Sequence, residues 1–211
     1  MGEHVFLEMS NISMTFPGVK ALDQVSLNIR EGEVHALMGE NGAGKSTLIK
    51  IISGVQQPDP GAKILMDGKE VEFPNVHASI KLGINAIHQD LSLFPNLTVA
   101  ENIYLGRSRK GKIDWKECDR IAVDALERLS VEMDIHELLG NLSVAKQQLV
   151  AIARAISLSS RLLIMDEPTA TLSFSEVRML YEIIRKLKKE NIAILFISHK
   201  LDEVFEVSDR V

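Results

Sequence analysis

Short aliphatic runs separated by polar, glycine-containing breaks dominate the first third of the chain. Runs of this kind, rich in β-branched residues, favour strands because such side chains fit a half-buried pleated surface. They predict strands at residues 5–9, 25–29, 34–38 and 84–88. Residues 64–71, with Asp67-Gly68 at their centre, predict a β-hairpin that turns at this pair.

Helical periodicity follows the third strand and becomes the main pattern after residue 96. Asp114 with Glu117 three residues later resembles the start of a capped helix that runs to about Leu129. Apolar positions at helical spacing predict further helices at 45–53, 144–156 and 174–187. Buried strands are predicted at 162–165 and 192–197, and strand–helix–strand spacing implies a parallel sheet with right-handed crossovers.

Composition narrows the class of protein only a little. The 211 residues are 45% hydrophobic and 25% charged, which is ordinary for a globular protein. A formal net charge of −5 argues against a dedicated nucleic-acid binder. Cys118 is the only cysteine, so no disulfide can form within the chain, and the apolar runs are too short to cross a bilayer. We therefore expect a cytoplasmic protein.

A glycine-rich segment between a predicted strand and a predicted helix matches the phosphate-binding P-loop pattern in full. Its residues are Gly39, Glu40, Asn41, Gly42, Ala43, Gly44, Lys45, Ser46 and Thr47. Glycines allow backbone N–H groups to turn inward around phosphate oxygens, and the helix N-terminus adds partial positive charge. Lys45 is expected to reach the β- and γ-phosphates of ATP, and the Ser46 hydroxyl to bind Mg²⁺.

Two carboxylates end the predicted strand 162–165. Ligands of open α/β sheets gather at the carboxyl ends of the strands. Asp166 is therefore expected to hold Mg²⁺, directly or through water, and Glu167 to act as general base for attack on the γ-phosphate.

These motifs, with four further features in the right order, resemble the ATP-binding domains of ABC transporters. Gln89 resembles the family's Q-loop glutamine, which contacts Mg²⁺ and couples to the membrane subunit. Residues 142–148, with Ser143, resemble the signature segment, and Asp166-Glu167-Pro168-Thr169 resembles the typical Walker B ending. His199 lies where the family has its switch histidine, bridging the γ-phosphate and Glu167. Phe16 lies where an aromatic ring stacks on adenine, although a core position would explain it as well.

The resemblance covers the chain from about Val5 onward and implies an α/β P-loop NTPase fold. In that fold a mostly parallel core sheet carries an N-terminal antiparallel part and an inserted helical subdomain. It implies an ATP-binding core at 1–96 and 160–211, truncated at its C-terminus, and a helical signature subdomain at 97–159. The implied partners are a second ATP-binding domain, in tandem or as a homodimer, and transmembrane permease subunits, with no nucleic acid. The ATPase would then lie peripherally on the inner face of the cell membrane.

The nearest resemblance within the family is to the first half of tandem-domain importers of ribose, galactose and related sugars. This resemblance rests on the exact P-loop sequence, the segment 87–107 and the glycine-poor signature. An ATPase that powers import of a monosaccharide is the implied function. The alternative is a soluble ABC ATPase that acts on ribosomes or DNA without a membrane partner.

Two departures from the family pattern concern the contact between paired domains. Val144, Ala145 and Lys146 replace the usual Gly-Gly-Gln of the signature, and side chains there should hinder close backbone approach to nucleotide. Ser173 stands where the family often has Asp. The last residues, 208–211, read like the entry to another strand, so we expect the sequence to be part of a longer protein.

Overall fold

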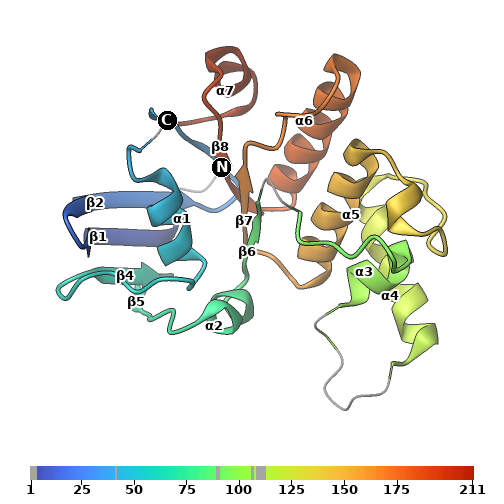
Figure 1. Cartoon of the computed structure of the whole chain (residues 1–211), viewed down its shortest axis with the longest axis horizontal. Coiled ribbons are helices and arrows are strands. Elements are labelled where there is room, and N and C mark those ends of the chain that lie inside the picture. Colours follow the sequence, from blue (N-terminus) through green and yellow to red (C-terminus); the bar gives the residue numbers. More distant parts are fainter. Residues whose placement is uncertain (1–3, 41, 89–90, 106, 108–112) are drawn as a thin grey trace.

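The computed structural model describes residues 4–40, 42–88, 91–105, 107 and 113–211. Its strands form two sheets, one antiparallel and one parallel, as the sequence predicted. Figure 1 shows the antiparallel sheet at one end of the molecule, the parallel strands in the middle and a group of helices at the other end. The parallel sheet therefore lies between two structurally different halves.

The antiparallel sheet has the strand order β2-β1-β4-β5. Its strands are β1 (Val5–Phe16), β2 (Val19–Arg30), β4 (Lys63–Met66) and β5 (Lys69–Glu70). The hairpin at Asp67-Gly68 is confirmed, but the first two strands are much longer than predicted. Irregular register between β1 and β2 explains the difference, because bulges disturb the alternation that marks a strand in sequence.

The second sheet is parallel throughout, with the order β3-β8-β7-β6. Its strands are β3 (Val34–Leu37), β6 (Ile84–Ile87), β7 (Leu162–Asp166) and β8 (Ala193–Ile197). All four were predicted to within a residue or two. After the final helix, His35 pairs with Arg210 in an isolated parallel bridge, so the segment expected to enter a strand does lie beside β3.

The helices are α1 (Lys45–Ile52), α2 (Val76–Lys81), α3 (Val99–Tyr104), α4 (Trp115–Leu129), α5 (Val144–Ser157), α6 (Phe174–Lys189) and α7 (Leu201–Val207). The predicted helices 45–53, 144–156 and 174–187 correspond to α1, α5 and α6. The short helices α2 and α7 were not predicted, because six or seven residues carry too little periodicity to be recognised.

Side-chain caps fix where several helices begin. Asp114 accepts a hydrogen bond from the backbone N–H of Glu117 at 3.1 Å, which confirms the predicted start of α4. Thr98 and Glu101 form a reciprocal capping box at α3. At α6, the backbone N–H of Ser173 donates to Glu176 at 2.8 Å. The residue that departs from the family pattern therefore starts a helix.

Two hydrophobic clusters pack against opposite faces of the parallel sheet. Leu163 and Met165 of β7 belong to the cluster that includes α3, α4, α5 and α6. Leu162 and Ile164 belong to the cluster that includes α1 and the antiparallel sheet. Because successive strand residues point to opposite faces, each central strand contributes to both clusters. The division into a core (1–96 and 160–211) and a helical subdomain (97–159) stays a prediction.

Candidate functional site

The phosphate loop connects β3 directly to α1. Gly42 and Gly44 both adopt left-handed backbone angles, with φ of +87° and +85°. At Gly44 an added Cβ would lie 2.6 Å from the backbone oxygen of Ala21 and 2.7 Å from Leu22 Cδ2. Glycine at this position thus satisfies both the backbone angle and the close approach of β2.

The N-terminus of α1 opens toward the loop without a side-chain cap. The first N–H groups of a helix have no intrahelical partner, so an uncapped start presents donors and partial positive charge to an anion. The Lys45 ammonium group donates to the backbone oxygens of Gly39 and Glu40, at 2.6 and 2.9 Å. It therefore lies folded over the loop that the sequence assigned to phosphate.

The predicted metal ligand Asp166 ends β7 and is half-buried. Burial raises the pKa of its carboxyl group and Glu167 raises it further, whereas His88 and Lys45 act in the opposite direction. A desolvated carboxylate gains most from a bound cation. With the exposed Ser46 hydroxyl on the first turn of α1, it supplies the hard oxygen donors that Mg²⁺ prefers. These residues fit the metal.

Glu167 and His199 meet between the ends of β7 and β8. The two side chains interact through Glu167 Oε1 and His199 Nδ1 at 3.2 Å. Glu167 has a positive φ of 49°, and its backbone N–H donates to the Ile197 oxygen at 3.0 Å. A non-glycine residue in this conformation is strained and often marks a functional site. The predicted contact between Glu167 and His199 is present, and their roles in hydrolysis stay predictions.

Two other predicted site residues lie on elements outside the phosphate loop and the ends of β7 and β8. Ser143 caps the start of α5, where its Oγ accepts from the Lys146 N–H at 3.4 Å. In Figure 1, α5 lies on the opposite side of β6 and β7 from α1, and the next residue, Val144, lines a small cavity together with Asp166 and Glu167. Phe16 is half-buried at the end of β1, opposite Val19.

The remaining predicted residues belong to the loop or lie outside the described part of the chain. The N–H of Ala43 donates to the Glu40 oxygen at 3.1 Å, and Thr47 lies in the first turn of α1. Asn41 and Gln89 lie outside the described residues. Their assigned roles stay predictions.

Two residues near the site were not singled out from sequence. His88 follows β6 and acts electrostatically on Asp166. Its position at the carboxyl end of a parallel strand was the signal that could have identified it. Glu203, on α7, contacts the segments after β7 and β8. No sequence signal marked it, because α7 itself was not predicted.

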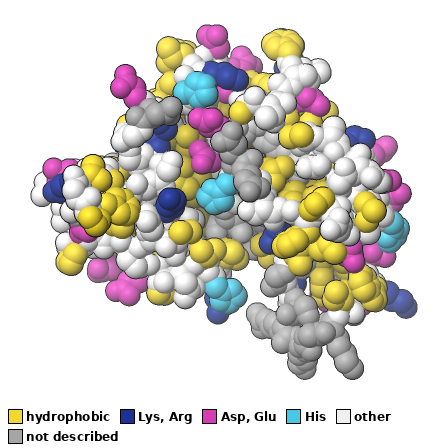
Figure 2. All heavy atoms as spheres, in the orientation of Figure 1, with side chains coloured by type: hydrophobic (Ala, Val, Ile, Leu, Met, Phe, Trp, Pro, Cys, Tyr) yellow, Lys and Arg dark blue, Asp and Glu magenta, His cyan; other side chains and the backbone are white. Residues whose placement is uncertain are grey.

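Acidic, basic and histidine side chains gather in the middle of the face shown in Figure 2, over the region where the parallel strands end. Patches of hydrophobic side chains lie among polar ones over the helical half of the same view. The charged centre therefore coincides with the carboxyl edge of the parallel sheet.

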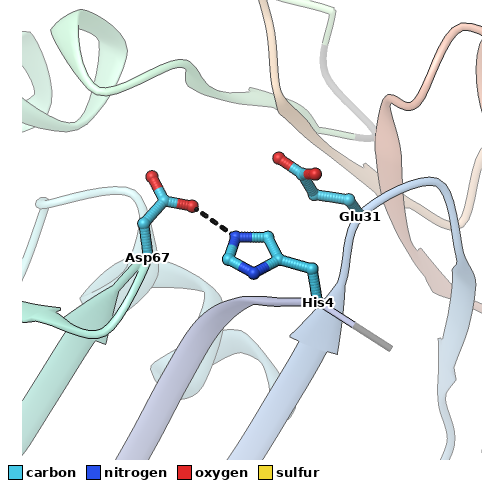
Figure 3. Close-up of side chains that lie close together, drawn as sticks. All are labelled: His4, Glu31 and Asp67. Atoms are coloured by element: carbon cyan, nitrogen blue, oxygen red, sulfur yellow. Dashed lines mark hydrogen bonds and ion pairs between the residues drawn. The ribbon is translucent and has the colours of Figure 1, made fainter. Parts of the chain in front are cut away.

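A second polar cluster, formed by His4, Glu31 and Asp67, lies elsewhere (Figure 3). His4 Nε2 contacts Asp67 Oδ1 at 3.0 Å. Arg161 already pairs with both carboxylates, at 2.7 Å to Asp67 and 2.6 Å to Glu31. The guanidinium supplies the positive charge that a metal would otherwise bring. The cluster is therefore an ion-pair network that joins the antiparallel sheet to the start of β7.

Comparison with known proteins agrees with this geometry. The sequence profile of the ABC transporter family matches residues 22–170. A ribose import ATP-binding protein, RbsA 1 of Rubrobacter xylanophilus, is 52% identical over 207 residues, which are 97% of this chain and 41% of the relative. The chain thus spans less than half the length of that relative.

Solved structures show the same fold. The ADP conformation of MJ1267, an ATP-binding cassette of an ABC transporter, gives a TM-score of 0.85 at 28% identity, covering 97% of this chain and 85% of the other. A dimeric post-hydrolysis state of the cassette MJ0796, bound to ADP and Pi, gives 0.78 at 26% identity, covering 93% and 89%. The chain belongs to the ABC transporter family, as one of its ATP-binding domains.

Proposed function

We propose that this protein binds and hydrolyses ATP to power the import of a monosaccharide through a membrane permease. The observation that carries the proposal is the convergence of Lys45, Asp166 and the Glu167–His199 pair at the carboxyl edge of the parallel sheet. The name of the Rubrobacter xylanophilus relative supports the choice of a sugar as the transported solute.

The phosphate loop would bind the nucleotide through backbone N–H groups and Lys45. Lys45 would exchange its two loop oxygens for the β- and γ-phosphates, so the ammonium group keeps its hydrogen bonds when nucleotide enters. Ser46 and Asp166 would hold Mg²⁺, which neutralises developing charge on the phosphates. Phe16 is proposed to stack on the adenine ring.

Hydrolysis requires a group that orients and deprotonates water. Glu167 would accept the proton of a water molecule that attacks the γ-phosphorus, as the bond from phosphorus to the β–γ bridging oxygen breaks. His199, at 3.2 Å from Glu167, would hold the carboxylate in one orientation and donate to the γ-phosphate. Gln89 is proposed as a further contact to the metal.

A second ATP-binding domain would complete the site. Ser143 is exposed at the N-terminus of α5, where it would meet nucleotide held by a partner. The dimeric MJ0796 cassette, which carries ADP and Pi, supports such pairing. ATP contacts made only in the closed pair would shift the equilibrium between open and closed forms.

The permease is proposed to dock beside the Gln89 segment. A cavity of about 310 Å³ lies at the end of β6 and is lined also by α2 and by Arg154 of α5, so it spans both halves of the molecule. A partner seated in it would sense their relative movement. Among the described residues no helix has the length and apolarity needed to span a bilayer. We therefore propose a peripheral position on the inner face of the membrane.

Mg-ATP binding and turnover test the central proposal. Ligand at about 1,000 times its dissociation constant should raise the free energy of unfolding by about 4 kcal/mol. Thermal unfolding with and without Mg-ATP should show this stabilisation in the wild type and a reduced one in Lys45→Ala. Glu167→Gln should keep the stabilisation and lose phosphate release. Phosphate release by Glu167→Gln near the wild-type rate would remove Glu167 from its role.

Membrane fractionation distinguishes this proposal from the alternative, a soluble ABC ATPase that acts on ribosomes or DNA. Co-expression with a permease should move the protein into the membrane pellet. Continued recovery in the supernatant, together with binding to ribosomes, would favour the alternative.

A further inference from the structure

One buried carboxylate joins the two segments that carry the proposed catalytic pair. The Glu203 side chain on α7 is only 11% exposed. Its Oε2 accepts hydrogen bonds from Thr169 Oγ1 at 2.6 Å and Ser198 Oγ at 2.9 Å. Its Oε1 pairs with Lys200 Nζ at 2.9 Å. Both carboxylate oxygens are therefore engaged.

The partners of Glu203 lie next to the catalytic residues in sequence. Thr169 is two residues after Glu167, in the segment that follows β7. Ser198 and Lys200 flank His199, and the backbone N–H of Lys200 also donates to Ser198 Oγ at 3.1 Å. Movement of either segment relative to the other would break hydrogen bonds to Glu203.

The side chains of the proposed catalytic pair, Glu167 and His199, are not held in place by burial. The His199 side chain is 62% exposed and that of Glu167 is 31% exposed. Glu167 also has a strained backbone, which persists only where neighbouring groups fix it. Contacts behind the pair must therefore supply the rigidity that its own burial does not.

Glu203 is suited to this role because it stays ionised. Burial alone would raise the pKa of its carboxyl group, but hydrogen bonds from Thr169, Lys200 and Ser198 together hold that pKa below its ordinary value. Hydrogen bonds to a charged group are shorter and stronger than neutral ones. The ionised carboxylate therefore fixes both hydroxyl groups at once.

We propose that Glu203 is a positioning residue, which sets the placement of Glu167 relative to His199 for attack of water on the nucleotide. This inference rests on the proposed function. It predicts a defect in turnover with no defect in nucleotide binding, since Glu203 contacts neither the phosphate loop nor Asp166 in the hydrogen bonds and ion pairs of the described residues.

The test is ATP turnover by the intact protein in its assembled transporter, with Glu203→Gln as the main variant. Gln keeps the size of the side chain but loses the charge. Small misplacement of a catalytic group costs up to about 100-fold in rate, so we expect kcat to fall about 10- to 100-fold. KM for ATP and the thermal shift caused by Mg-ATP should stay at wild-type values.

Glu206→Gln is the matched control. Glu206 lies on the same helix and pairs with Arg185 at 2.6 Å, but it is exposed and, among the described residues, forms no hydrogen bond or ion pair with Thr169, Ser198 or Lys200. Its kcat should equal that of the wild type. Thr169→Val is a second variant, which removes one hydroxyl and should lower kcat to a smaller extent even if Glu203→Gln unfolds.

The possible outcomes distinguish failure of the role inferred for Glu203 from failure of the proposed ATPase function. If Glu203→Gln lowers the melting temperature but leaves kcat within twofold of wild type, the residue only anchors α7 and the inference is wrong. If KM and kcat change together, the carboxylate supports binding and the inference is equally wrong. If the wild-type protein neither binds nor hydrolyses Mg-ATP, the proposed function itself fails.

Discussion

Gly42 and Gly44 have nearly the same backbone angle but different surroundings. Both have φ near the centre of the left-handed region. Among the described residues no atom beyond its chain neighbours lies within 4 Å of a Cβ built at Gly42, whereas one at Gly44 would collide with Ala21 and Leu22 of β2. Substitution at Gly42 therefore tests backbone strain alone, whereas substitution at Gly44 tests backbone strain together with a steric clash.

Alanine at each position gives the first residue-scale prediction. Left-handed φ costs a non-glycine residue about 1–2 kcal/mol. Gly42→Ala should lower the free energy of unfolding by about that amount, as measured by urea denaturation. Gly44→Ala should lower it by more, and should also weaken Mg-ATP binding because β2 must move. Equal losses from the two variants would contradict the close approach.

At this scale the sequence predicted which residues form the site better than how they are held. The P-loop glycines, Lys45, Asp166 and Glu167 follow from short motifs with known chemistry. The clash at Gly44 depends on β2, more than twenty residues earlier in the chain, and the contacts of Glu203 depend on an unpredicted helix. Such long-range contacts leave no local pattern.

The start of α5 carries Val144, Ala145 and Lys146, at which the sequence departs from the family signature. Val144 is the first residue of the helix and its side chain is 50% exposed, next to the exposed capping residue Ser143. A branched side chain here would keep a partner's phosphate away from the helix N–H groups. The element is intact as a helix, so we expect the departure to affect contact with a partner rather than folding.

Restoring the glycines tests this interpretation. Val144→Gly with Ala145→Gly should increase ATP turnover in the paired assembly, at a stability cost of about 1–2 kcal/mol from helix propensity. Val123→Gly, at a partly exposed position inside α4, is a control for loss of a branched side chain in a helix, with a smaller propensity cost. Turnover that does not rise above that of the Val123 variant would show that Val144 and Ala145 do not limit the site.

Long periodic elements were predictable, and short ones were not. The helices α4, α5 and α6 and the strands of the parallel sheet have clear periods or uniform apolar runs. In contrast, α2 depends on a cap by Asn75, whose side chain accepts from the Ala78 N–H. A single cap before six residues is a weak signal, although it is sufficient once tertiary contacts form.

Across the whole molecule, Arg161 links parts of the chain that are far apart in sequence. It donates to Asp67 at 2.7 and 2.9 Å and to Glu31 at 2.6 Å, and it lies 4.4 Å from the centre of the Phe6 ring. The hydrogen bonds from Arg161 hold the pKa of Asp67 at about 2, well below its ordinary value of 3.8. This network joins the two sheets at the end opposite the nucleotide edge.

The depressed pKa of Asp67 predicts a loss of stability in acid. The unfolded chain binds a proton to this carboxyl group before the folded one does, so stability falls as pH decreases from about 4 to about 2. Asp67→Asn should make the free energy of unfolding less dependent on pH over this window, as followed by urea titrations. His4→Gln removes a weaker partner and should leave most of the dependence. An unchanged slope in Asp67→Asn would contradict the assignment.

The two clusters that share the parallel sheet restrict how this sequence can vary over time. In β7, Leu162, Leu163, Ile164 and Met165 are all fully buried, and alternate residues face opposite clusters. A strand with one solvent-exposed face can accept polar substitutions at half of its positions, whereas β7 can accept them at none of these four positions. Any polar residue that arises here would bury an unsatisfied group. Divergence in β7 should therefore be confined to exchanges among aliphatic residues, right up to the carboxylates at its end.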